Sequence, residues 1–143
     1  AAALARTIAQ VLGRRGAAEW ALDAWSSSAS GDVGRDRTEA RGFTEALGEG
    51  SRAVAVTAVK GALGEMLGAA GALQALVLVE GMRSGRLPGI AGLATPDSDL
   101  GITLSAEGRA VDLRLGLATA VGFDGAVEAL LLRRWEGEHF ATR

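Results

Sequence analysis

The sequence predicts an α/β fold, a mixed sheet of about five strands with helices on both faces. Three stretches predict it. Residues 53–59 form a short, valine-rich apolar run, which is typical of a buried strand. An apolar helix extends to about Met82, and after residue 100 apolar and polar residues alternate, which indicates half-buried strands. Strands interleaved with helices require a sheet that is covered on both sides.

The first half of the chain predicts two helices and two strands. Apolar residues at helical spacing predict a helix over residues 4–12, closed by Gly13 and Gly16. Residues 20–25 form a short segment that is flanked by tryptophans and bounded by turn signals, which favours a strand. Residues 26–34 are expected to form a polar loop. The next helix carries Phe43, Ala46 and Leu47 and ends at Gly48, ahead of the strand at 53–59.

The second half predicts strands. Pro88 and Pro96 exclude a helix after Gly85. Strands are expected around residues 102–104, 111–117 and 127–132, with a turn at 122–125. The predicted order is α-β-α-β-α-β-β-β.

Composition narrows the classes of function. The 15 basic and 17 acidic residues nearly balance, so neither nucleic acid nor a membrane is an expected partner. Without cysteine the chain has no disulfide, thiolate metal site or cysteine nucleophile, and we expect no metal site and no cofactor. We expect one domain over residues 1–135, a polar tail over 136–143 that contains His139, and a cytoplasmic location, since no signal segment is evident.

An ordered series of motifs then resembles one family. Asp36-x-x-Glu39 is followed by Lys60, by the sequence GEMLGAAGAL at 64–73, by Leu87-Pro88, and by Gly-Phe-Asp-Gly at 122–125. This series resembles the C-terminal half of β-ketoacyl synthases, the condensing enzymes of fatty-acid and polyketide synthesis. The resemblance implies a thiolase-like half that packs on a second, similar half.

The departures from the family pattern concern its two catalytic histidines. Ser28 stands where the first histidine is expected, eight residues before Asp36, and Glu65 stands where the second is expected, five residues after Lys60. Asp124 and Val127 replace the second turn glycine and an asparagine of the pattern. In the family, the imidazoles stabilise the enolate oxygen formed by decarboxylation, and such donors are worth roughly 3–4 kcal/mol each. An ionised Glu65 would oppose that charge, and Lys60 is close enough in sequence to pair with it.

Other positions have a structural and a functional interpretation. Asp36 and Glu39 fit a helix N-cap with an acidic third residue. Glu65 is expected to be buried in a former active site, with an ordinary helix-start glutamate as the alternative. Phe123 is expected to fill the core, or to gate an acyl pocket as its family counterpart does. Four glycines between residues 61 and 71 are expected to permit close packing: Gly61, Gly64, Gly68 and Gly71.

The resemblance implies a catalytically degenerate subunit like the chain-length factors of polyketide synthases. Such a subunit pairs with an active ketosynthase, as a heterodimer or heterotetramer, shapes the acyl-chain pocket and meets an acyl carrier protein. One alternative is an acyltransferase of the same fold that uses Glu65 as general base. Another is a purely structural half. An N-terminal half of the same fold is expected in each case, and the missing start methionine suggests that it precedes this segment.

Overall fold

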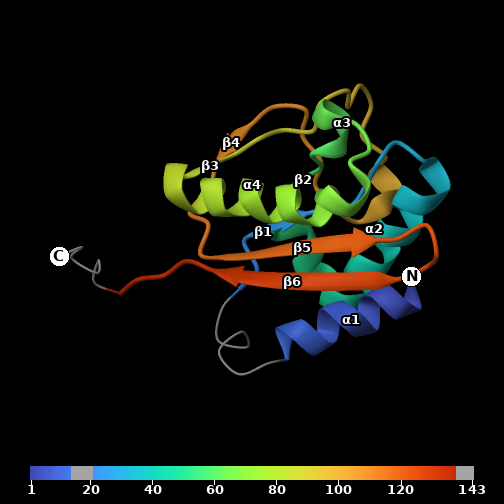
Figure 1. The fold of residues 1–143 in the computed structure, drawn as a ribbon, viewed down its shortest axis with the longest axis horizontal. Coiled ribbons are helices and arrows are strands. Elements are labelled where there is room, and N and C mark those ends of the chain that lie inside the picture. Colours follow the sequence, from blue (N-terminus) through green and yellow to red (C-terminus); the bar gives the residue numbers. More distant parts are fainter. Residues whose placement is uncertain (14–20, 138–143) are drawn as a thin grey trace.

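The computed structural model describes residues 1–13 and 21–137, which form a layered α/β unit around a four-stranded sheet (Figure 1). The strand order is β2-β1-β5-β6; β1 runs parallel to both β2 and β5, and β6 is antiparallel to β5. The strands are β1 (Ala24–Ser26), β2 (Ala55–Thr57), β5 (Leu115–Val121) and β6 (Val127–Arg133). The predicted mixed sheet is therefore confirmed.

Helices cover both faces of this sheet. On one face α1 (Ala2–Leu12) packs on α2 (Val33–Leu47) and on β6. On the other face α4 (Ala70–Ser84) packs against β1 and β5, and Figure 1 shows it running alongside β5. The smaller elements are α3 (Lys60–Leu63), the 3-10 turns η1 (Gly48–Ala53), η2 (Leu67–Ala69) and η3 (Ser98–Leu100), and a separate antiparallel pair, β3 (Arg86–Leu87) with β4 (Arg109–Ala110).

The alternation of side chains along β1 divides the core into two layers. Trp25 points toward α1 and α2, where its ring stacks on Phe43 at a centroid distance of 4.0 Å. Ala24 points the other way and packs with Leu78 of α4. Small residues keep α4 close to the sheet: a Cβ at Gly116 would lie 3.2 Å from the Leu78 side chain. The small residue at position 116 thus lets α4 approach β5 closely.

Apart from the strand expected at 102–104, the main elements follow the predicted order but differ at their bounds, and the strand expected at 111–117 lies at Leu115–Val121. The first two helices and the last strand are confirmed, whereas the strand expected at 20–25 begins only at Ala24 and includes Ser26, which was assigned to the loop. Asp23, just before β1, is also held between the neighbouring strands. Its N–H donates to the Leu115 carbonyl oxygen at 3.0 Å and its carbonyl oxygen accepts from the Ala55 N–H at 2.9 Å, while its carboxylate accepts from the N–H groups of Arg114 and Leu115, each at 2.8 Å. Residues 16 and 20 lie outside the described part of the chain.

The described residues contribute four strands to the main sheet, where about five were predicted. Residues 102–104 are irregular rather than extended into a strand, although Ile102 and Leu104 still pack on the core. A helix long and apolar enough to cross a membrane does not occur in the described ranges.

Candidate functional site

Three side chains from distant parts of the sequence meet at one edge of the sheet. Ser28 follows β1 and Lys60 follows β2, and the carboxyl ends of parallel strands lie at the same edge. Lys60 Nζ donates a hydrogen bond to Ser28 Oγ at 3.3 Å and forms an ion pair with Glu65 Oε2 at 2.9 Å. The two positions where the family pattern has histidine are therefore joined through one lysine.

Glu65 lies at the rim of this site. Its side chain is 32% exposed, while that of Lys60 is only 8% exposed, so the prediction that Glu65 is buried is wrong for this chain. The hydrogen bond from Lys60 is the main reason that the pKa of Glu65 is lowered, and the Leu67 N–H adds a second bond at 3.0 Å. Glu65 is thus held as a carboxylate, and its predicted pairing with Lys60 is present.

A buried glutamate, Glu39, is hydrogen-bonded to the backbone of Ser28 on the core side of the site. Glu39 Oε1 accepts hydrogen bonds from the Ser28 N–H at 2.8 Å and from Thr119 Oγ1 at 2.6 Å, and Trp25 Nε1 donates to Thr119 Oγ1 at 2.8 Å. Burial raises the pKa of Glu39 to about 7, although both hydrogen bonds and the charge of Lys60 act in the opposite direction. One chain of polar contacts therefore runs from the core to the pocket rim.

The expected N-cap role of Asp36 and Glu39 is wrong. The cap of α2 is Asp32, which accepts a hydrogen bond from the Arg35 N–H at 3.0 Å. Asp36 lies within the helix, where its two carboxylate oxygens accept from the N–H groups of Ser30 and Gly31. Both acidic residues hold the loop that carries Ser28, and Asp36 also contributes to the raised pKa of Glu39.

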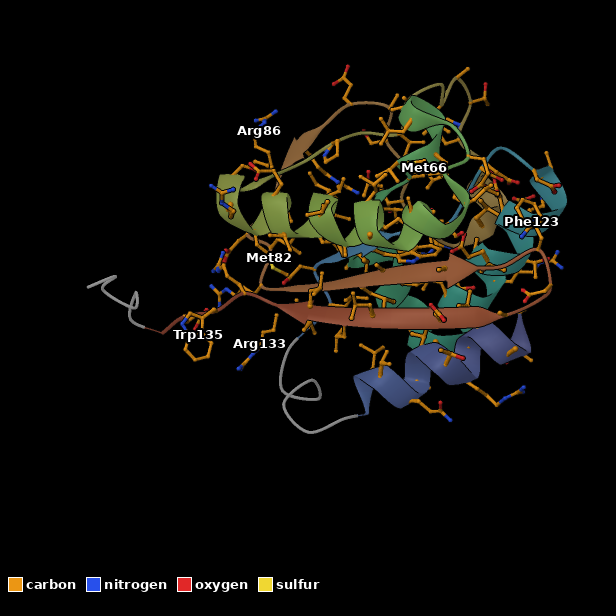
Figure 2. All side chains as sticks on the ribbon, viewed as in Figure 1. Met66, Met82, Arg86, Phe123, Arg133 and Trp135 are labelled. Carbon is orange, nitrogen blue, oxygen red and sulfur yellow. The ribbon has the colours of Figure 1, made fainter. Side chains whose placement is uncertain are left out.

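Phe123 lies on the surface rather than in the core. Its side chain is 74% exposed, and the Arg35 guanidinium lies 4.4 Å above its ring, a cation–π contact. Figure 2 shows Phe123 and Met66 toward the same end of the molecule, opposite Trp135. Phe123 borders a cavity of about 380 Å³ that also contacts Ser28, Lys60 and Glu65. The core-filling interpretation is therefore wrong, and Phe123 stands at the edge of the pocket.

The glycines of the 64–73 segment have different roles. Gly64 adopts a φ of +78°, which favours glycine, but a Cβ at Gly64 or at Gly68 would meet nothing within 4 Å in this chain. A Cβ at Gly71 would make an ordinary contact with Ala120 at 3.9 Å. Close packing does occur at the fourth glycine, Gly61, where a Cβ would collide with the Ala91 carbonyl oxygen. The packing prediction is therefore wrong for Gly64 and Gly68 within the described residues.

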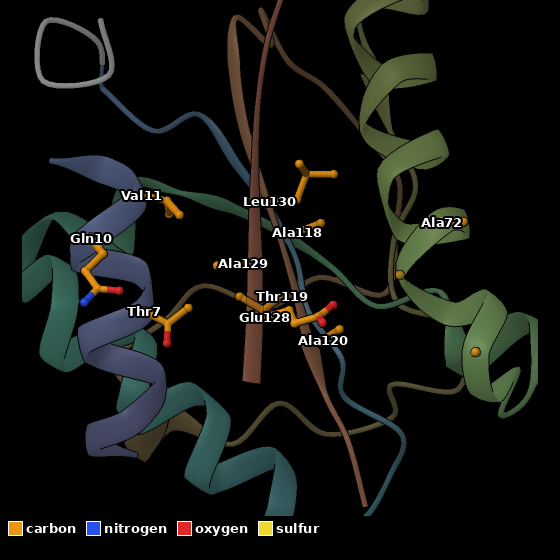
Figure 3. Close-up of a pocket in the computed structure, with 12 residues that line it drawn as sticks. Thr7, Gln10, Val11, Ala72, Ala118, Thr119, Ala120, Glu128, Ala129 and Leu130 are labelled. Atoms are coloured by element: carbon orange, nitrogen blue, oxygen red, sulfur yellow. The ribbon is translucent and has the colours of Figure 1, made fainter. Parts of the chain in front are cut away.

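A second, larger cavity of about 610 Å³ lies along the edge of β6, between α1 and α4. Figure 3 shows Gln10 of α1 and Leu130 of β6 on its walls, with Ala72 of α4 beyond them. It adjoins the first cavity at Gly71 and Glu128, but its lining does not include Ser28, Lys60 or Glu65. A cluster of three or more metal-ligating side chains is absent from the described ranges.

Known proteins share the fold of this chain and are similar to it in sequence. Residues 1–94 match the family described as "Beta-ketoacyl synthase, C-terminal domain". The described unit superposes with a TM-score of 0.84 on a structure described as the ishigamide ketosynthase/chain length factor, at 25% identity, covering 92% of this chain and 32% of that one. The chain therefore belongs to the β-ketoacyl synthase family and has the thiolase-like fold of its C-terminal half.

Two curated relatives show how much of such a protein this chain represents. A Streptomyces coelicolor protein described as an actinorhodin polyketide β-ketoacyl synthase 1 is 33% identical over 113 residues, which cover 78% of this chain and 24% of the relative. The 3-oxoacyl-[acyl-carrier-protein] synthase 2 of Vibrio harveyi is 32% identical over 111 residues, covering 76% of this chain and 26% of the relative. The chain thus spans about a quarter of the length of these relatives.

Proposed function

We propose that this chain is the C-terminal half of a non-catalytic ketosynthase-like subunit, which pairs with an active ketosynthase and shapes the pocket for the growing acyl chain. The observation that carries the proposal is the Lys60–Glu65 ion pair beside Ser28. Decarboxylation of a malonyl thioester builds negative charge on the thioester oxygen, and catalysis requires donors that point at that oxygen. Here a carboxylate and a hydroxyl take the places of two imidazoles.

The charges of the site support this proposal. The Lys60 ammonium is engaged by Glu65 Oε2 and Ser28 Oγ, so its hydrogen bonds are directed to the protein rather than to a substrate oxygen. The lowered pKa of Glu65 keeps a negative charge at the pocket rim. Together they neutralise the pocket without restoring an electrophilic donor, which suits a site that holds acyl groups but does not condense them.

The N-terminal half of the same fold is proposed as the partner of the outer face of α4. Leu76 and Val79 are 59% and 41% exposed on this helix, and Leu67 just before it is 70% exposed. Apolar side chains gathered on one helix face favour a covering partner, and the matched segments cover only 24% and 26% of the two relatives. An acyl carrier protein is the proposed donor of the acyl chain, by analogy with the relative whose name includes one.

The alternative, an acyltransferase that uses Glu65 as general base, is less consistent with the geometry. A general base works best when its pKa lies near the working pH, whereas the pKa of Glu65 is lowered and its carboxylate is tied to Lys60. A Glu65→Gln variant of the full protein distinguishes the two. Loss of acyl transfer would favour the alternative, and unchanged product formation by the complex would favour the proposal.

The proposed function is tested with the full-length protein and its active ketosynthase partner. Condensation of malonyl units on a carrier protein is measured with and without this subunit, and the length of the product is determined. We expect omission to abolish or shorten the product. Phe123→Ala is expected to change product length, whereas Trp135→Ala, at a residue that is 72% exposed at the opposite end of the molecule, is the matched control. Equal condensation without the subunit would overturn the proposal.

A further inference from the structure

A buried polar layer lies between α4 and the strands β1 and β2, beneath the candidate site. Trp25 and Val56 point into the core on the α1 and α2 side. Because side chains alternate along a strand, Ser26 and Thr57 point to the opposite side, toward α4. These two residues are also register partners in the parallel β1–β2 pair. Two hydroxyl side chains therefore stand side by side on the α4 face of the sheet.

The third member of the layer comes from α4. Ala24, Ala55 and Leu78 pack together in the core on that face. Two residues further along each strand are Ser26 and Thr57, and one turn back along α4 is Gln74, which is fully buried. The three polar residues thus form the next layer of the same helix–sheet contact.

The orientation of the Gln74 amide is fixed by its hydrogen bonds. Gln74 Nε2 donates to the carbonyl oxygens of Ser26 at 3.1 Å and Thr119 at 2.7 Å, so the nitrogen end of the amide is identified by two acceptors. Its Oε1 must therefore point elsewhere. Gln74 Oε1, Ser26 Oγ and Thr57 Oγ1 are all buried and have no hydrogen-bond partner within residues 1–13 and 21–137.

We propose that one ordered water molecule bridges Gln74 Oε1, Ser26 Oγ and Thr57 Oγ1. Buried waters in proteins typically make about three hydrogen bonds to polar groups that otherwise lack partners. A water can donate to the amide oxygen and either donate to or accept from each hydroxyl. A cation suits the site less well, because the three oxygens are neutral and the Gln74 amide N–H groups lie beside them.

The water has a structural consequence for the site above it. Ser26 ends β1 two residues before Ser28, and Thr57 ends β2 three residues before Lys60. A molecule bonded to both strand ends and to α4 fixes the spacing from which Ser28 and Lys60 project. This inference holds whether or not the subunit is catalytic, so it is independent of the proposed function.

The first test is a crystal structure of the full-length protein at a resolution that places ordered waters. We expect one density peak about 2.7–3.2 Å from each of the three oxygens. Crystals soaked in rubidium chloride should show no anomalous signal there. An empty site, or direct hydrogen bonds among the three side chains, would overturn the proposal, and an anomalous rubidium peak would assign the site to a cation.

The second test uses the sign of a stability change. Thr57→Val removes a hydroxyl at nearly constant shape, and if that hydroxyl binds the water we expect the thermal midpoint to fall by about 2–4 °C. Thr57→Ser, which keeps the hydroxyl, provides the comparison, and Thr57→Val combined with Ser26→Ala should be non-additive because the two groups share one water. A midpoint that rises or stays unchanged in Thr57→Val would show an unsolvated hydroxyl and contradict the proposal.

Discussion

Replacing Glu39 by glutamine should remove a pH-dependent penalty from the stability of this protein. Glu39 is 5% exposed, and burial raises its pKa from 4.5 to about 7. The folded state therefore holds the proton to higher pH than the unfolded state. Stability is unaffected by this group below about pH 4.5, falls as the pH rises toward 7, and is lowest above 7. The difference between pKa values of 4.5 and 7 corresponds to about 3 kcal/mol.

The variant Glu39→Gln keeps an oxygen that can accept from Thr119 and from the Ser28 N–H, but it does not titrate. The free energies of unfolding of the wild type and the variant should therefore differ by about 3 kcal/mol more at about pH 8 than at about pH 4, in favour of the variant. Denaturation midpoints measured across this range check the result. Glu45→Gln, at an exposed position on the same helix, is the control and should leave the slope between about pH 5 and 8 as in the wild type. Parallel curves for wild type and Glu39→Gln would refute the reasoning.

Two further predictions concern the ion pair and the outer face of α4. In a double-mutant cycle of Lys60→Met and Glu65→Gln, we expect a coupling of about 1 kcal/mol in unfolding free energy, since Glu65 is partly exposed; additive effects would show that the pair contributes nothing. Leu76→Asp and Val79→Asp should make the full-length protein aggregate or unfold at lower temperature, because they place charges in the proposed contact with the N-terminal half. Glu80→Gln on the same helix is the control, and aspartate variants as stable as the control would contradict that contact.

Hydrophobic periodicity predicted the longer helices and strands. It did not predict the bounds of elements that depend on pairing with residues far away in the sequence. The apolar spacing of residues 4–12 is a local signal, and both this helix and the strand expected at 127–132 form. The position of β1 is instead decided by its neighbours, since Ala24–Ser26 pair with β2 on one side and with β5 on the other. Residues 102–104 alternate like a strand, yet the described chain offers them no strand to pair with.

The sequence predicted which residues form the site better than it predicted how they are arranged. Motif spacing brought Ser28, Lys60 and Glu65 together correctly, but the exposure of Glu65 depends on how the loop after α3 turns at Gly64, where φ is +78°. The buried role of Glu39 had a signal in the sequence, since it lies one helical turn before the core residue Phe43. Its partner Thr119 is 80 residues away and could not be found from local pattern.

Release of carbon dioxide from a malonyl-loaded carrier protein tests the central claim most directly. The full-length chain, purified without any partner ketosynthase, is assayed for decarboxylation beside an active ketosynthase. We predict release no faster than the background without protein, because Ser28 and the Glu65 carboxylate stand where the two imidazole donors are expected, and the negative charge of Glu65 opposes the developing oxyanion. Release at a rate comparable to that of the active enzyme would contradict the account.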